Sequence, residues 1–333
     1  MINADLRTIS MMDWLENDLL MIISSCEIAS SDASFRRYFR VNSEQTSYIV
    51  MDAPPEKENI EPFINVAKIF SASNINVPNI YQQNMEEGFL LLEDFGTECF
   101  LDKLNGHTAN GLYKIACDEL FKLQSQIDIK KITLPHYDEA FFERELVIFE
   151  DWFLHGLLDI EAPILLWDRV RRLLINSAVE QPVVCVHRDY HSRNLMTLND
   201  DSVGVIDFQD AVVGPITYDL VSLLKDCYIA WPDSAVENWL FDYYQRLIQA
   251  NLINCSLTDF KRWFDLMGMQ RHLKAVGIFA RLHIRDNKSM YLQDIPRTLG
   301  YIKAVCVKYP EFAEWGAYIE YQVLPKFEGY LLL

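Results

Sequence analysis

The sequence predicts an α+β fold of two lobes, a small β-rich N-terminal lobe and a larger, mostly helical C-terminal lobe. Before residue 96, aromatic and β-branched residues alternate with polar ones in short runs bounded by turn formers, which is typical of strands. After residue 96, apolar residues recur every three or four positions, which is typical of helices. We therefore expect domains of residues 1–96 and 97–333.

The N-terminal part reads as an opening helix followed by short strands and one further helix. The helix is expected over 61–73, where Phe63 and Phe70 stand at helical spacing and Pro62 is tolerated in the first turn. Strands are expected within the runs 26–41, 47–53, 76–84 and 88–96. The last of these runs ends in an acidic, glycine-terminated segment at 93–96, which we expect to join the lobes.

The C-terminal part contains one β island between helices. Apolar stripes predict helices around 112–127 and 142–153. The island comprises a strand at 182–186, a loop, and two strands at 194–198 and 203–207 that flank a turn at 199–201. After Gly214-Pro215 the pattern is helical again from Tyr218.

Composition and charge exclude several classes of protein. The 333 residues are 50% hydrophobic, enough for one large domain or two lobes with real cores. A formal charge of -18 would repel nucleic acid and anionic membranes. The seven cysteines are scattered without a CxxC pair, which argues against a disulfide framework and a zinc site. No long uncharged apolar run predicts a membrane span or secretory signal, so we expect a cytoplasmic protein.

The β island concentrates the residues that could carry chemistry. In HRDYHSRNLMTLNDDSVGVIDFQD, Asp189 follows a short apolar strand, Asn194 comes five residues later, and Asp207 ends the strand VGVI. Phosphoryl transfer requires an aligned hydroxyl, a carboxylate to take its proton, and Mg²⁺ ions on the polyphosphate. Magnesium prefers hard oxygen ligands. We expect the three side chains to converge, with Asp189 as base or orienting group and Asn194 and Asp207 holding Mg²⁺.

These motifs resemble the protein-kinase-like fold, whose catalytic loop runs H-R-D-x-x-x-x-N before a later D-F-G. The segment VHRDYHSRN fits the loop, and IDFQD fits the second motif with Gln209 in place of glycine. The short hairpin between them and GPITYDLVSLL directly after resemble the aminoglycoside phosphotransferase family. The segments DASFRRYFR, VMDAPPE, FLLLEDFG, HRDYHSRNLM, IDFQDAVVGPITYDLVSLLKD, QRHLKAVGIFARL and YLQDIPRTL are similar to its bacterial branch that phosphorylates the anomeric hydroxyl of N-acetylmuramate or N-acetylglucosamine.

The resemblance implies ATP and Mg²⁺ as cofactors, a small sugar as partner, and supporting roles around the loop. It implies that His187 braces the catalytic loop and that Asp219, which would also suit a helix N-cap, anchors it from below. His191 stands where many protein kinases place a lysine that touches the transferred phosphate. Arg193 could do the same work with a permanent charge, or contact the acceptor.

The N-terminal half departs from the kinase pattern. Met51 lies near the place of the usual strand lysine, and no lysine occurs between residues 1 and 56. Arg36 or Arg37 is therefore a candidate ligand of the phosphates, although strand arginines often point to solvent. The backbone from Glu93 to Phe95 resembles the hinge that pairs with adenine.

The acceptor and the activity leave alternatives open. Glu145, Arg271 and His272 could reach the acceptor, and a cation there would suit the lactyl carboxylate of N-acetylmuramate. A solvated helix face is the plainer interpretation of each one alone. An aminoglycoside, choline or homoserine-like acceptor would keep the motifs, and a non-catalytic pseudokinase module would explain Met51 and Gln209.

Overall fold

The computed structural model describes residues 5–31, 35–44, 46–198 and 202–332. Its contacts divide the chain into two compact units. The first comprises Met1–Phe100 together with Asn194–Asp210, and the second comprises Leu101–Arg193 together with Ala211–Leu333. The segment from Asn194 to Asp210 therefore packs with the N-terminal unit, although residues of the second unit precede and follow it in the chain.

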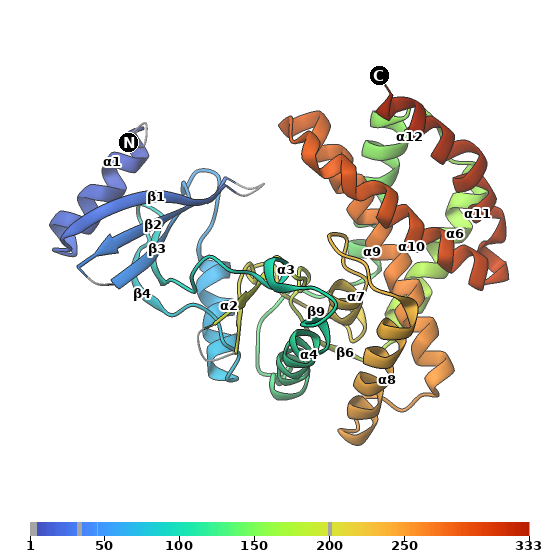
Figure 1. The fold of residues 1–333 in the computed structure, drawn as a ribbon, viewed down its shortest axis with the longest axis horizontal. Helices are drawn as coiled ribbons and strands as arrows, with labels where there is room; N and C mark the ends of the chain where they lie inside the picture. Colours follow the sequence, from blue (N-terminus) through green and yellow to red (C-terminus); the bar gives the residue numbers. More distant parts are fainter. Residues whose placement is uncertain (1–4, 32–34, 45, 199–201, 333) are drawn as a thin grey trace. The chain divides into compact units, whose positions relative to one another are not determined.

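The first unit is built on a five-stranded antiparallel sheet with the strand order β1-β2-β3-β5-β4. Figure 1 shows it in blue and teal. Its strands are β1 (Ile23–Ser31), β2 (Arg37–Ser43), β3 (Thr46–Asp52), β4 (Ile80–Asn84) and β5 (Phe89–Glu93). These strands fall within or overlap the runs that the alternating pattern predicts, and with the helical second unit they give the expected α+β class.

The N-terminal helical residues of the chain cover one face of this sheet. Helix α1 (Leu6–Asp13) begins at Asp5, whose carboxylate accepts the backbone N–H of Thr8 at 2.8 Å. It continues into a π-helical turn, η1 (Trp14–Asp18). Apolar residues of both pack against alternate strand residues, namely Phe39, Val41, Val50, Phe89 and Leu91. Strand residues of the other parity, Met51 among them, belong to the opposite face.

The hairpin from Asn194 to Asp210 is fixed in the first unit by apolar contacts. It comprises β7 (Leu195–Thr197) and β8 (Val203–Val205), and the turn predicted at 199–201 lies outside the described residues. The Phe208 ring lies 4.7 Å from Phe63, on helix α2 (Glu61–Ala72). A side chain at Gly204 would place its Cβ 2.4 Å from the Phe95 ring, so only glycine fits there.

The second unit is helical except for β6 (Val183–Val186), which pairs with β9 (Val212–Pro215) in antiparallel register. Its helices are α3 (Phe100–Lys103), α4 (Ala109–Gln126), α5 (Glu139–Ile148), η2 (Phe149–Leu157), α6 (Ile164–Val179), α7 (Tyr218–Leu224), α8 (Asp233–Gln249), α9 (Leu257–Asp286), η3 (Ser289–Asp294), α10 (Ile295–Lys308), η4 (Pro310–Phe312), α11 (Ala313–Tyr318), η5 (Ile319–Val323) and α12 (Leu324–Leu331). No described helix is long and apolar enough to cross a membrane.

Helix α9 organises the second unit. It contacts α5, η2, α6, α7 and α10, and Figure 1 shows α10 running beside it. From Phe264 to Lys274 every residue is buried, including Asp265, Arg271 and Lys274. Helix α9 therefore places charged side chains in the interior of the second unit. Buried charges of this kind require compensating partners.

Candidate active site

The catalytic-loop sequence is held in the second unit by a buried carboxylate. Strand β6 leads into His187, and Asp219 accepts the backbone N–H of His187 at 2.7 Å and that of Arg188 at 2.9 Å. Burial raises the pKa of Asp219 to about 7, although both hydrogen bonds favour its ionised form. The expectation of an N-cap is wrong: α7 begins at Tyr218, Thr217 occupies the N-cap position, and Asp219 is in the first turn.

Arg188 gives this loop its local shape. Its φ of 78° lies in the left-handed region, which is uncommon for a residue other than glycine. The backbone N–H of Asp189 donates to Nδ1 of His187 at 3.2 Å, so the histidine supports the loop from within. The loop therefore presents Asp189 on a backbone that Asp219 and His187 constrain.

Cations of the second unit keep Asp189 ionised. Burial opposes its charge, but Lys274, His191, Arg271 and Arg188 outweigh that effect and lower the pKa of Asp189 to about 2. A carboxylate with so low a pKa is a weak proton acceptor and a strong hydrogen-bond acceptor. Asp189 is therefore suited to orient a hydroxyl rather than to deprotonate it fully.

Glu145 is the counter-ion of two of these cations. Its Oε1 lies 2.7 Å from Lys274 Nζ and 2.9 Å from Arg188 Nη2. Its Oε2 accepts hydrogen bonds from Tyr137 and, at 3.3 Å, from Gln270. Only 3% of Glu145 is exposed. From the sequence, this carboxylate is expected to reach the phosphate acceptor. In the structure both of its oxygens are instead bonded to protein groups.

Arg271 and His272 differ in their surroundings. Arg271 is 6% exposed and donates only to the Cys227 sulfur, at 3.9 Å. Among the residues that the structure describes, no carboxylate forms an ion pair with it. His272 is fully buried, Nε2 lies 2.9 Å from the Lys225 carbonyl, and the ring stacks on Tyr301 at 4.7 Å. His272 is therefore bound by protein groups, whereas Arg271 forms no ion pair within the described ranges, although Asp189 and Asp226 act on it and its pKa is raised.

His191 and Arg193 share one aromatic partner. The His191 ring meets Tyr228 edge-on at 5.2 Å, and the Arg193 guanidinium lies 3.7 Å from the centre of the same ring. Burial lowers the pKa of the His191 imidazole, while Asp226 and Asp189 oppose this effect. Of the two side chains, Arg193 alone carries a permanent charge.

In the first unit, Asn194 and Asp207 lie together as expected. Asn194 Nδ2 donates to Asp207 Oδ2 at 3.2 Å, and the backbone N–H of Ile206 donates to the Asn194 carbonyl at 3.0 Å. Asp207 has a φ of 62°, and Gln209 Nε2 donates to its Oδ1 at 2.8 Å. The Asp207 carboxylate and the side-chain oxygen of Asn194 are hard oxygen donors, the type of ligand that Mg²⁺ prefers. Asp189 belongs to the other unit.

The two candidate arginines of the first unit have different partners. Arg37 shares the parity of Phe39 and forms ion pairs with Asp52 and Asp5. Arg36 lies immediately before β2, outside the strand. Met51, which is expected near the place of the usual strand lysine, is an apolar side chain with no exposed surface.

The surroundings of Arg36 are acidic. Burial opposes its charge, but Tyr38, Glu58, Asp210 and Asp207 raise its pKa above the ordinary value. Its Nε lies 3.5 Å from Glu58. The influence of Asp207 indicates that this guanidinium lies in the vicinity of the Asn194–Asp207 pair within one unit.

The segment expected to contact adenine is held by hydrogen bonds and packing. The backbone N–H of Glu93 donates to the Asn79 carbonyl at 2.9 Å, and the Glu93 carboxylate accepts from the Asn79 amide at 2.6 Å. Asp94 binds the Arg40 guanidinium at 2.6 Å, and Phe95 packs on Gly204. The segment is therefore fixed to the sheet and to the hairpin of Asn194 and Asp207.

Sequence reasoning missed three residues that shape the site. Lys274 and Arg188 act on Asp189, and Asp226 accepts hydrogen bonds from Ser192 Oγ at 2.5 Å and from its backbone N–H at 3.0 Å. The spacing of Arg271 and Lys274, three positions apart on one helix, was the available signal for a shared cationic face.

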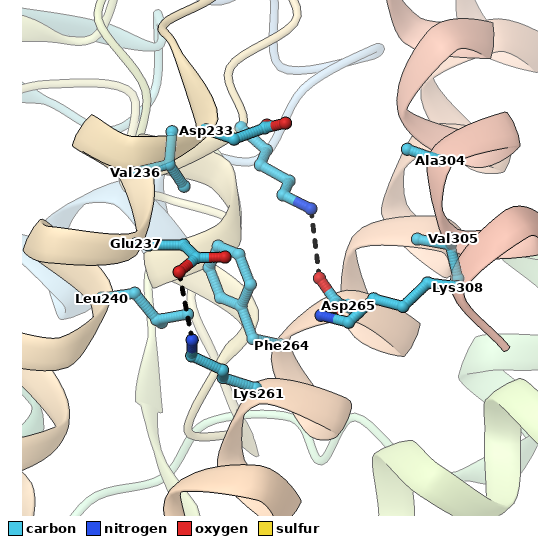
Figure 2. Close-up of a pocket in the computed structure, with 11 residues that line it drawn as sticks. Asp233, Val236, Glu237, Leu240, Lys261, Phe264, Asp265, Ala304, Val305 and Lys308 are labelled. Atoms are coloured by element: carbon cyan, nitrogen blue, oxygen red, sulfur yellow. Dashed lines mark hydrogen bonds and ion pairs between the residues drawn. The ribbon is translucent and has the colours of Figure 1, made fainter.

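A separate hollow of about 250 Å³ lies between α8, α9 and α10 and is lined by none of the expected site residues. Asp265 forms ion pairs with Lys225 at 3.1 Å and with Lys308 at 2.5 Å, and Figure 2 shows Asp265 and Lys308 in this hollow. Glu237 is paired with Lys261 at 3.3 Å. These charges compensate one another, so the hollow has no evident electrostatic preference for a ligand.

Comparison of the sequence finds close relatives that share one name. N-acetylmuramate/N-acetylglucosamine kinase of Pseudomonas putida is 44% identical over 330 residues, covering 95% of this chain and 96% of the relative. The kinase of the same name from Pseudomonas aeruginosa is 46% identical and covers 86% of each chain. That of Neisseria meningitidis serogroup B is 39% identical over 92% of this chain and 93% of its own.

Solved structures share the fold. Choline kinase LicA from Streptococcus pneumoniae superposes with a TM-score of 0.63 at 12% identity, covering 89% of this chain and 98% of its own. The ADP-bound aminoglycoside phosphotransferase APH(2'')-Ib gives a TM-score of 0.60 at 14% identity, covering 90% and 98%. Both confirm the two-lobed, protein-kinase-like fold class. The phosphotransferase enzyme family model matches residues 25–250, and the chain belongs to this family of enzymes.

Proposed function

We propose that this enzyme transfers the γ-phosphate of ATP to the anomeric hydroxyl of N-acetylmuramate and, with lower preference, of N-acetylglucosamine. Three relatives between 39% and 46% identical carry the names of these two sugars. ATP is an intracellular metabolite, so the proposed reaction belongs in the cytoplasm.

Asp189 is the group that we assign to the acceptor hydroxyl. Its pKa of about 2 keeps it ionised throughout the physiological range. As a hydrogen-bond acceptor it would align one lone pair of the sugar oxygen with the phosphorus and receive the proton only as the new bond forms. Alignment and charge neutralisation, rather than strong base catalysis, would then supply most of the rate.

Asn194 and Asp207 are the residues that we assign to Mg²⁺. When bound, the cation neutralises negative charge on the triphosphate. Arg36 would supply the positive charge that a strand lysine provides in other kinases, because Asp210 and Asp207 of the same unit contribute to the raised pKa of its guanidinium. The backbone from Glu93 to Phe95 would pair with adenine.

Arg271 is the residue that we assign to selection between the two sugars. Arg271 is 6% exposed and forms no ion pair among the described residues, although Asp189 and Asp226 raise its pKa, so an anionic group of the acceptor would complete its hydrogen bonds. The lactyl carboxylate of N-acetylmuramate is such an anion, and Arg binds carboxylates through two parallel hydrogen bonds. N-acetylglucosamine has no such group, so the two sugars should differ in affinity.

The same electrostatics disfavour the cationic acceptors. Choline and aminoglycosides would meet Arg188, Arg271 and Lys274, which all act on Asp189. Glu145 pairs with Arg188 and Lys274, and its oxygens are already bonded. A pseudokinase is disfavoured because Asp189, Asn194 and Asp207 are all present.

A panel of acceptors tests the proposal. Purified enzyme with ATP and Mg²⁺ is incubated with N-acetylmuramate, N-acetylglucosamine, choline, homoserine or an aminoglycoside, and products are examined by ³¹P NMR. We expect an anomeric sugar phosphate from the two amino sugars. Phosphorylation of a cationic acceptor alone, or no phosphorylation of any of them, would refute the proposal.

A further inference from the structure

Gln209 belongs to the second motif, IDFQD, and the proposed function assigns no role to it. It stands where protein kinases carry the glycine of D-F-G. Its Nε2 donates to Asp207 Oδ1 at 2.8 Å, while Asn194 Nδ2 donates to Asp207 Oδ2 at 3.2 Å. The two oxygens of one carboxylate are therefore held by two different side-chain amides.

The other end of the Gln209 amide lacks a hydrogen-bond partner within the part of the chain that the structure describes. Its Oε1 is enclosed by protein and accepts no hydrogen bond from the residues described here. A buried carbonyl oxygen in this condition costs free energy, and in native proteins it points to a water or an ion. Because Oε1 and Nε2 share one planar group, this oxygen lies in the same cluster as the Asp207 carboxylate.

The backbone around Gln209 is anchored. Phe208 is fully buried and its ring lies 4.7 Å from Phe63 and 5.8 Å from Phe70. The side chains on either side of Phe208 thus start from a fixed position. The terminal torsion of glutamine is nearly two-fold, so half a turn exchanges Oε1 and Nε2 with little other movement.

We propose that Gln209 is a third oxygen donor to the divalent cation held by Asn194 and Asp207. Its nitrogen holds the Asp207 carboxylate when the cation is absent, and its oxygen turns to the cation when the cation binds. This inference rests on the proposed function, because it requires Asn194 and Asp207 to form the metal site. A third protein oxygen would strengthen cation binding, since Mg²⁺ otherwise depends largely on water and phosphate oxygens.

Cation affinity tests the proposal without an activity assay. Free Mn²⁺ is titrated by electron paramagnetic resonance against the full-length enzyme, alone and with ADP. Gln209→Met keeps length and volume but removes the oxygen, and we expect about 10- to 100-fold weaker Mn²⁺ binding. Gln209→Glu keeps an oxygen and adds charge, so it should bind at least as tightly as wild type.

Two further measurements separate coordination from a structural role. The thioether of Gln209→Met is a soft ligand, so the variant should lose less affinity for Cd²⁺ than for Mg²⁺. Gln83→Met, at an exposed position on β4 of the same unit, is the matched control and should bind Mn²⁺ as wild type does. Thermal unfolding confirms that each variant is folded.

The outcomes distinguish this inference from the proposed function. If wild type binds Mn²⁺, Asp207→Asn loses that binding and Gln209→Met retains it fully, Gln209 is not a ligand and the inference is overturned. If Gln209→Met and Gln209→Glu weaken Mn²⁺ binding equally, the inference is overturned as well. Gln209 would then only position the Asp207 carboxylate and would not supply an oxygen to the cation. If wild type itself shows no Asp207-dependent Mn²⁺ binding, the proposed metal site fails, and this inference fails with it.

Discussion

Asn194 donates its side-chain amide to the carboxylate of Asp207 at 3.2 Å. The two residues are thirteen positions apart, and the β7–β8 hairpin closes that distance with register pairs from Leu195↔Val205 to Thr197↔Val203. A tight hairpin between the two motifs therefore suffices to assemble two of the three side chains on which the proposed chemistry depends.

Replacing the carboxylate at Asp189 should reduce turnover and leave nucleotide binding intact. We expect Asp189→Asn to lower kcat by about 10²- to 10⁴-fold, because the amide orients the hydroxyl less well and accepts no proton. The KM for ATP should change little. Steady-state kinetics with N-acetylmuramate measure both, and a kcat within a factor of about three of wild type would remove Asp189 from the mechanism.

The two neighbouring arginines should separate into a phosphate ligand and a structural residue. Arg36→Ala should raise the KM for ATP by about 10- to 100-fold, the size of one lost charge-assisted hydrogen bond. Arg37→Ala is the matched control: it leaves the buried Asp52 with fewer partners, so it should lower the Tm but not the affinity for ATP. Unchanged KM values in both variants would exclude the phosphate role.

Arg271 should discriminate between the two sugars. Arg271→Met should raise the KM for N-acetylmuramate by about 10- to 100-fold and that for N-acetylglucosamine by less than about three-fold, because only the first sugar carries a carboxylate. Arg262→Met, on the same helix and paired with Glu311, is the control. An equal effect on both sugars would show that Arg271 does not bind the lactyl group.

His272 should make the stability of the second unit depend on pH. Burial lowers the pKa of its imidazole from 6.5 to about 3. Between these values the unfolded chain binds a proton that the folded chain does not, so stability falls as pH decreases below 6.5. The contribution is about 2 kcal/mol at pH 5. In urea unfolding, His272→Gln should lose less stability than wild type between pH 7 and 5, and parallel losses would contradict this.

The sequence predicted elements wherever a pattern is local. Alternation in 47–53 gave β3, and helical spacing from Phe63 to Phe70 gave α2. The strand β9 was missed because Val212–Pro215 ends in Gly-Pro and reads as a turn. It is a strand only because Val183 to Val186, far earlier in the chain, pairs with it.

Long-range partners explain the remaining differences. The boundary expected at residue 96 treats each lobe as continuous, whereas the hairpin belongs to the first unit through contacts such as Val205 N–H to the Asn76 carbonyl at 2.8 Å. The hydrophobic periodicity of the sequence does not predict a contact between residues so far apart in the chain. Likewise, the sequence shows that His191 follows Asp189, but its lowered pKa results from burial in the folded unit.

The kinetics of Asp207→Asn with ATP, Mg²⁺ and N-acetylmuramate test the central claim. This substitution keeps the shape of the side chain and removes the charge that we assign to Mg²⁺. The account predicts a loss of kcat of about 10²- to 10³-fold or more, accompanied by loss of Mn²⁺ binding in the folded variant. A folded Asp207→Asn enzyme that turns over at the wild-type rate would contradict it.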